Sequence, residues 1–152
     1  MTTTYWLVQL YERDLDRLIK EVTLFNDSQN LWLTKAGVTN SAGNLCLHLI
    51  GNLNTYLGKQ LGNTGYVRDR AAEFSRKDVP VQEILDALSQ TKAMVTQVLE
   101  QLTESDLEQI YPEQVWGDDI QTGYFLIHLA THLNYHLGQV NYLRRILEAP
   151  EN

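Results

Sequence analysis

Four long stretches of the chain place apolar residues three or four positions apart, and this spacing constrains the fold more than any other feature. On an α-helix such residues lie on one side and form an apolar stripe. The stretches cover about residues 4–25, 41–61, 80–102 and 122–147. No stretch shows the period-two alternation of a strand with similar strength. We therefore predict an all-α fold, a four-helix bundle, formed by residues 1–152 as a single domain.

The connections between these stretches differ in length. Residues 62–79 form a connection much longer than the two to eight residues usual in a bundle. A connection of this length either crosses the bundle or covers a site, where its charged residues can bring charge, and we expect a long crossover. Trp32 is expected to pack on the bundle from an ordered connection. Thr122 or Asp119 is a candidate N-cap for the last helix, and Asn40 or Ser41 for the second.

Composition and charge limit the possible partners. Hydrophobic residues make up 43% of the chain, charged residues 20%, and the net charge is −7. An acidic protein repels phosphate groups, so nucleic acids and anionic membrane surfaces are disfavoured as partners. No apolar run reaches the roughly 20 residues of a membrane span, and the first residues lack the pattern of a signal peptide. With Cys46 as its single cysteine, the chain is expected to be cytoplasmic.

Histidines are the most distinctive residues of the sequence. His128, His132 and His136 follow one another at intervals of four in the last predicted helix, and His48 lies in the second. A histidine pair one turn apart, with a third histidine from another helix, can form a three-histidine metal site in a bundle. The alternative for His48 is a core histidine with one hydrogen-bond partner.

Helix geometry prevents all three histidines of the last helix from binding one ion. Between His128 and His136 an α-helix rises about 12 Å, whereas zinc–nitrogen bonds are about 2.0–2.1 Å long. The ligand pair is therefore His128/His132 or His132/His136. Spacing does not decide between them, although Gln139 lies close enough to His136 in sequence to hydrogen-bond near the second pair.

Two segments carry a family resemblance. The sequences N-L-C-L-H-L-I-G-N-L at residues 44–53 and H-L-A-T-H-L-N-Y-H-L-G-Q at residues 128–139 resemble the DinB-like superfamily of four-helix metalloproteins. This superfamily includes YfiT-like metal-dependent hydrolases and bacterial thiol-dependent S-transferases. The resemblance implies His48, His132 and His136 as ligands of a divalent ion, zinc or nickel, and leaves His128 as a neighbouring or core residue. It also implies a bundle with a long crossover and a homodimer.

Such a site suggests a chemistry and supporting residues. A divalent ion held by neutral imidazoles can activate water or a thiol, which would serve a hydrolase or a thiol S-transferase acting on a small molecule. Asn52, one turn from His48, is a candidate neighbour of the metal ligands. Arg68 and Arg70 are candidates for binding an anionic substrate, with surface salt bridges as the alternative, and Glu73 is a weak candidate for a general base.

Two other functions remain compatible with the sequence. One is a non-catalytic bundle that binds a metal or a small ligand. The other is an interaction module whose histidines are structural. Metal analysis and a search for turnover separate the three possibilities.

Overall fold

Four long helices account for most of the structure, a computed structural model that describes residues 1–150. They are α1 (Thr3–Thr23), α2 (Ala42–Leu53), α4 (Val81–Gln101) and α6 (Thr122–Leu147). Shorter elements lie between them: the 3₁₀-helix η1 (Ser28–Trp32), the π-helix η2 (Asn54–Lys59), α3 (Arg70–Ser75) and α5 (Glu104–Glu108). No named strand occurs within residues 1–150, which confirms the all-α prediction.

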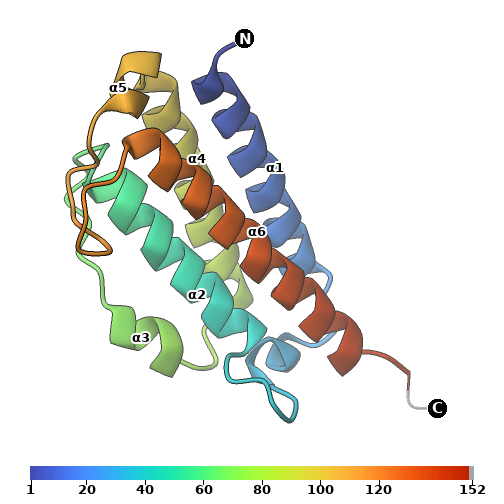
Figure 1. Cartoon of the computed structure of the whole chain (residues 1–152). Helices are drawn as coiled ribbons and strands as arrows, with labels where there is room; N and C mark the ends of the chain where they lie inside the picture. Colours follow the sequence, from blue (N-terminus) through green and yellow to red (C-terminus); the bar gives the residue numbers. More distant parts are fainter. Residues whose placement is uncertain (151–152) are drawn as a thin grey trace.

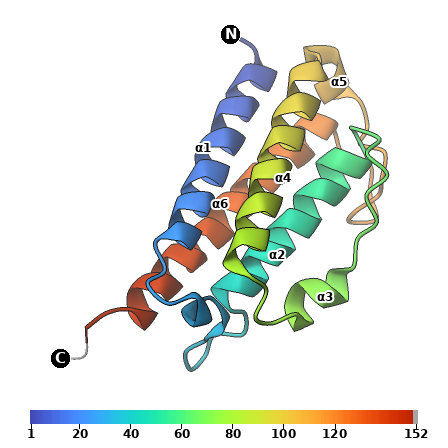
Figure 2. The same cartoon turned by 180° about the vertical axis from the view of Figure 1, so that it is seen from behind.

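The long helices form a bundle in which α1 and α2 occupy opposite corners. Both pack against α4 and α6 (Figures 1 and 2). Helices α2 and α4 run in the same direction, because the chain between them returns along the length of the bundle (Figure 1). The predicted long crossover is therefore present, and α3 forms its lower part beside α2.

The core is formed by the predicted apolar stripes. From α1 it takes Leu7, Tyr11, Leu15, Leu18 and Val22, all nearly inaccessible to solvent. Burial of one such side chain contributes about 1.5–3 kcal/mol to folding. The buried Tyr11 hydroxyl also needs an acceptor, and it donates to the carbonyl of Leu126 at 2.7 Å, which joins α1 to α6.

Polar contacts between the parallel helices α1 and α6 repeat after seven residues. Asn134 donates to Asp14 at 2.9 Å, and Asn141 donates to Glu21 at 2.7 Å. Arg144 adds an ion pair to Glu21 at 2.7 Å. A repeat of seven residues keeps both contacts on the same side of each helix. These contacts therefore fix the register of α6, which carries three of the histidines.

The second helix ends differently from the prediction. Its α-helical part is Ala42–Leu53, and the chain then continues as the π-helix Asn54–Lys59 rather than as an α-helix to residue 61. At the junction the Thr55 hydroxyl donates to the carbonyl of Gly51 at 2.7 Å. Such side-chain bonds compete for backbone carbonyls and perturb the α-helical pattern. At the other end, the predicted N-cap Ser41 accepts from the amide of Asn44.

Two short helices occur where the sequence predicted irregular connections. Helix α3 begins after Asp69, whose carboxylate accepts from the amide of Ala72 at 3.0 Å. Helix α5 begins with a capping box between Thr103 and Asp106. Both caps satisfy amides that have no helical acceptor. Trp32 is partly buried against the core, as predicted.

The predicted caps of the last helix are wrong. Its N-cap position is Gln121, which makes no capping bond with its side chain, rather than Asp119 or Thr122. The chain is held there by backbone pairing, since an isolated antiparallel bridge joins Ile110 to Gln121. Backbone pairing of this kind leaves no signature in the residue types.

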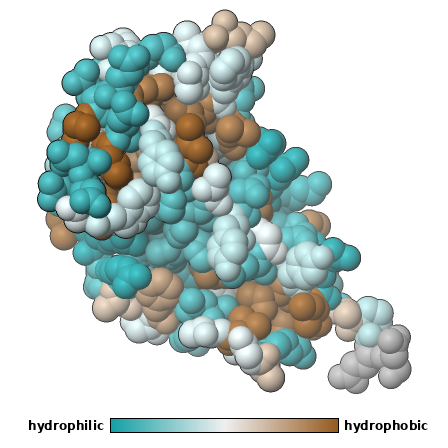
Figure 3. All heavy atoms as spheres, viewed as in Figure 1, coloured by the Kyte–Doolittle hydropathy of each residue, from teal (hydrophilic) through white to brown (hydrophobic). Residues whose placement is uncertain are grey.

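Large apolar and aromatic side chains are exposed along α6. They are Tyr124, Ile127, Tyr135, Tyr142 and Ile146. Hydrophobic residues gather near the C-terminal end of this helix on the face drawn in Figure 3. None of the helices within residues 1–150 combines the length and the hydropathy that a membrane span requires.

Candidate metal centre

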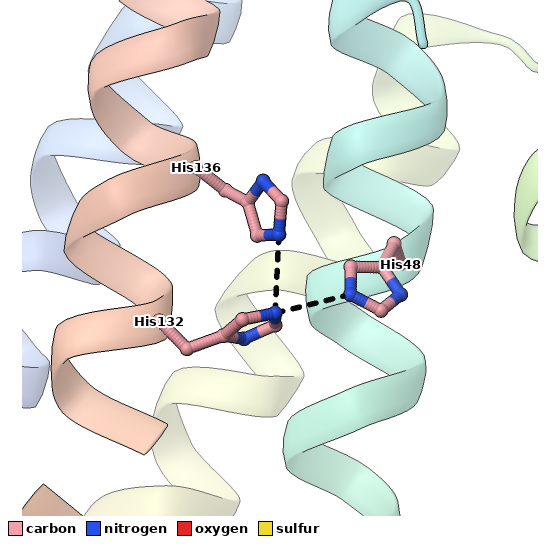
Figure 4. A group of neighbouring side chains, drawn as sticks. All are labelled: His48, His132 and His136. Carbon is pink, nitrogen blue, oxygen red and sulfur yellow. Dashed lines mark hydrogen bonds between the residues drawn. The ribbon is translucent and has the colours of Figure 1, made fainter. Parts of the chain in front are cut away.

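Three histidine side chains from two neighbouring helices converge inside the bundle (Figure 4). His48 extends from α2, and His132 and His136 extend from α6. The Nε2 atom of His132 lies 3.3 Å from that of His48 and 3.1 Å from that of His136. All three residues offer a ligand nitrogen within 4.8 Å of the other two.

These separations fit a tetrahedral ion. Bonds of about 2.0–2.1 Å in tetrahedral geometry place neighbouring ligand nitrogens about 3.3 Å apart. The nitrogen of His132 is therefore already at ligand spacing from those of His48 and His136, although 3.1–3.3 Å also suits an N–H···N hydrogen bond without an ion. Neutral imidazole is a ligand that zinc and nickel both accept.

His128 lies outside this cluster. Its ring stands edge-on to that of Trp116, with centroids 4.7 Å apart, and is stacked 6.3 Å from the ring of His132. Of the two pairs that helix spacing left open, the structure brings His132 and His136 together with His48. The metal ligands implied by the family resemblance thus lie together, and His128 is their half-buried neighbour.

The outer nitrogens of the three imidazoles have different surroundings. Nδ1 of His136 lies 2.7 Å from Oε1 of Gln139, so the glutamine predicted to bond near this site does so. Nδ1 of His48 is 3.4 Å from the carboxylate of Glu73 without the angle of a hydrogen bond. Nδ1 of His132 is buried and has no partner within residues 1–150. A histidine bound to metal through Nε2 carries a proton on Nδ1, so these contacts bear on metal binding.

Glu73 is buried and paired, which differs from the surroundings expected of a general base. Arg68 donates to both carboxylate oxygens, at distances from 2.8 to 3.2 Å. The carboxylate reaches this position because Gly51 has no side chain: a Cβ there would lie 2.5 Å from Oε1 of Glu73. The sequence marks Gly51 as a position for close packing or for a ligand, but it does not link this glycine to Glu73.

Burial favours the neutral form of His48 and His132. The pKa of His48 is lowered to about 3, first by burial and then by the neighbouring His132, His136 and two arginines. The pKa of His132 is lowered to about 4, first by burial and then by His136 and His128. Neutral imidazole is the form that binds a metal ion. At neutral pH these two histidines therefore need not lose a proton before they bind a metal ion.

A cavity of about 220 Å³ opens beside the cluster. Its walls include His48, Asn52, Arg68, Arg70, Trp116, His128 and His132. The amide of Asn52 makes no hydrogen bond within residues 1–150, and its Oδ1 is buried. Arg70 is exposed, and its guanidinium lies 5.4 Å from the ring of Phe74. All the side chains proposed from sequence for the site, except His136, Glu73 and Gln139, thus line one cavity.

A second cavity, of about 470 Å³, includes His136 in its wall. Gln139, Tyr135, Tyr142 and residues 37–40 contribute to its walls, which contain no lysine, arginine, aspartate or glutamate. The two cavities therefore differ in charge, and the cationic one contains two of the three metal-ligand candidates.

Comparison with known proteins agrees with this arrangement. The sequence pattern of the DinB superfamily matches residues 10–140, which include all four histidines. The chain belongs to the DinB superfamily. Membership agrees with the four-helix fold and with a histidine cluster able to hold a metal ion.

One solved structure shares the fold of this chain. The crystal structure of a conserved protein from Enterococcus faecalis superposes with a TM-score of 0.77 over 99% of each chain. The two sequences are 16% identical, so this likeness concerns the fold alone. A search of curated proteins found no match to the chain.

Proposed function

We propose that this protein is a metal-dependent enzyme that uses a three-histidine site to activate water or a thiol toward a small-molecule substrate. The convergence of the Nε2 atoms of His48, His132 and His136 carries this proposal. A divalent ion, zinc or nickel, held by three neutral imidazoles keeps its full charge and lowers the pKa of water or a thiol that it binds. Hydrolysis and S-transfer are the two reactions that such activation serves.

The cationic cavity is the proposed substrate site. Arg70 forms no ion pair within residues 1–150, so its guanidinium is available to an anionic group. Arg68 lines the same cavity, but its guanidinium already pairs with Glu73, so its contribution to substrate binding is smaller. The unpaired amide of Asn52 can hydrogen-bond to a substrate or to water held near the metal.

The proposal is tested by metal content and turnover together. Tag-free protein is analysed for bound metals and then offered electrophiles with several low-molecular-weight thiols, and ester and amide substrates in parallel. Thiol consumption that requires the metal identifies an S-transferase, and ester or amide cleavage identifies a hydrolase. Chelator-treated protein is the control, because its activity must be lost and must return with the ion.

A non-catalytic protein that binds a metal or a small ligand is the second candidate. The pairing of Glu73 with Arg68 favours it, because that carboxylate is already occupied by a guanidinium. A protein that binds zinc tightly and turns over no substrate of any class would match this function.

The remaining proposals concern assembly and location. A homodimer is proposed because the exposed apolar side chains of α6 offer a surface that a second copy can cover. We retain the proposal of a cytoplasmic protein, for which the single cysteine is the support. The net charge of −7 supports a role without nucleic acid.

A further inference from the structure

The carboxylate of Glu73 lies between a guanidinium and a candidate metal ligand. The residue is 6% exposed, its two oxygens accept from Arg68, and Oε1 lies 3.4 Å from Nδ1 of His48. Both Arg68 and Glu73 belong to the crossover between α2 and α4, whereas His48 belongs to α2. The crossover therefore contacts the histidine cluster through one buried acidic side chain.

The backbone of α2 is shaped to admit this carboxylate. Gly51 lies three residues after His48, and any Cβ at this position would collide with Oε1 and Cδ of Glu73, at 2.5 and 2.7 Å. Glycine inside an α-helix costs about 1 kcal/mol relative to alanine. The helix carries that cost at the position where the carboxylate approaches.

Metal binding would give Nδ1 of His48 a proton to donate. In this structure the nitrogen is buried without a hydrogen bond, and Glu73 provides the nearby acceptor. A carboxylate that accepts from a metal-bound histidine orients the ring and strengthens it as a ligand. We propose that Glu73 is a positioning residue for His48, and that metal binding is thereby coupled to the packing of residues 68–73 against α2. This inference rests on the proposed metal site.

A contact that does not use the Glu73 side chain also holds α3 against α2. Asn44 donates to the backbone carbonyls of Glu73 and Arg76, both at 2.9 Å. These bonds use main-chain oxygens, so substitution of the Glu73 side chain leaves them in place. We therefore expect variants at Glu73 to fold, which allows their comparison with the wild-type protein.

The first test measures zinc affinity by competition with a chelating dye. Glu73→Ala is expected to weaken zinc binding by about 10- to 100-fold, and Glu73→Gln by less, because its amide oxygen can still accept from Nδ1. Glu83→Gln is the matched control, since it breaks an exposed ion pair with Arg76 away from the histidines. It should leave zinc affinity unchanged.

Gly51→Ala provides a second route to the same contact. The new methyl group displaces the carboxylate of Glu73, so zinc affinity should fall. Alanine also favours the helix, so we do not expect the loss of stability that a folding defect would cause. Wild-type affinity in both Glu73→Ala and Gly51→Ala would overturn the inference.

The second test follows the crossover directly. Zinc should slow tryptic cleavage after Arg68 and Arg70 in the wild-type protein, and this protection should be lost in Glu73→Ala at saturating zinc. Equal protection in the variant would contradict the coupling. If the wild-type protein binds neither zinc nor nickel, the proposed function fails together with the inference. If it binds zinc but Glu73→Ala and Gly51→Ala do so equally well, the inference alone fails.

Discussion

His128 and His136 both lie one helical turn from His132, yet their surroundings differ. His136 faces His48 across the gap between α6 and α2, whereas His128 lies beside Trp116 in the cavity wall. The distance along the helix excludes only that His128 and His136 bind the same metal ion. The partner helix decides between them, because His48 lies at the level of the His132/His136 pair.

Alanine substitutions test this assignment. His48→Ala, His132→Ala and His136→Ala should each reduce bound zinc to a small fraction of the wild-type content, because two imidazoles are a poor site for the ion. His128→Ala is the matched control on the same helix and should retain wild-type zinc. Metal analysis of the four purified variants provides the measurement. Loss of zinc in His128→Ala with retention in His136→Ala would assign the other pair.

Sequence reasoning found the histidines because residue type and spacing carry that information. The pairing of Arg68 with Glu73, and the space left by Gly51, depend on how the crossover folds back on α2. The three-to-four-residue spacing of apolar side chains predicts a helix, but it does not predict the path of a long connection between two helices. The sequence thus identifies Glu73 as a residue of interest and suggests a role as a base. The buried ion pair with Arg68, which the sequence does not reveal, does not favour that role.

Asp14 makes the contact between α1 and α6 sensitive to pH. Burial alone would raise the pKa of this carboxyl group, but hydrogen bonds from Arg13 and Asn134 and the charges of Arg13 and Arg17 outweigh burial and lower it. A pKa lowered by folding means that the unfolded chain binds the proton more readily. The stabilisation is complete above the pKa of the unfolded state and is lost as the pH falls through the lower pKa of the folded state.

Asp14→Asn should remove this contribution. The variant is expected to be less stable than the wild-type protein at neutral pH, and the difference should shrink as the pH falls below about 4. Urea unfolding at a series of pH values measures it. A constant difference from pH 7 to pH 3 would contradict the assignment of the lowered pKa to Asp14.

Gly138 lies in the interior of α6 on its exposed side, where a Cβ would meet no atom within 4 Å. Gly138→Ala should therefore stabilise the protein by up to about 1 kcal/mol, because alanine loses less backbone entropy in a helix. Denaturant unfolding of the metal-free protein measures the change. Destabilisation by Gly138→Ala would indicate a contact that a second copy or a ligand makes at this position.

Among the elements, the long helices were predictable and the short ones were not. Stripes of many apolar residues mark α1, α4 and α6, because each must bury one side over several turns. Helix α3 has six residues and α5 has five, so neither displays a period. Where the π-helix follows α2, the Thr55 hydroxyl bonds to the carbonyl of Gly51, a contact that a hydrophobic pattern does not reveal.

At the scale of the whole molecule, the exposed apolar side chains of α6 predict self-association. The mass in solution, measured by light scattering, should be twice the 17.5 kDa of one chain. Tyr142→Glu combined with Ile146→Glu should shift the protein toward the monomer, because charges would be buried at the interface. Gln97→Glu, on the exposed side of α4, is the control and should leave the mass unchanged. A wild-type protein of monomer mass would contradict the prediction.

The histidine cluster joins residues that are 84 positions apart, His48 in α2 and His132 in α6. During synthesis, His48 leaves the ribosome long before His132 and His136 exist. A growing or truncated chain without α6 offers a single histidine from the cluster. Tight uptake of a metal ion by the proposed site would thus become possible only after α6 has been made, and retention of the ion would distinguish chains that include α6 from chains that lack it.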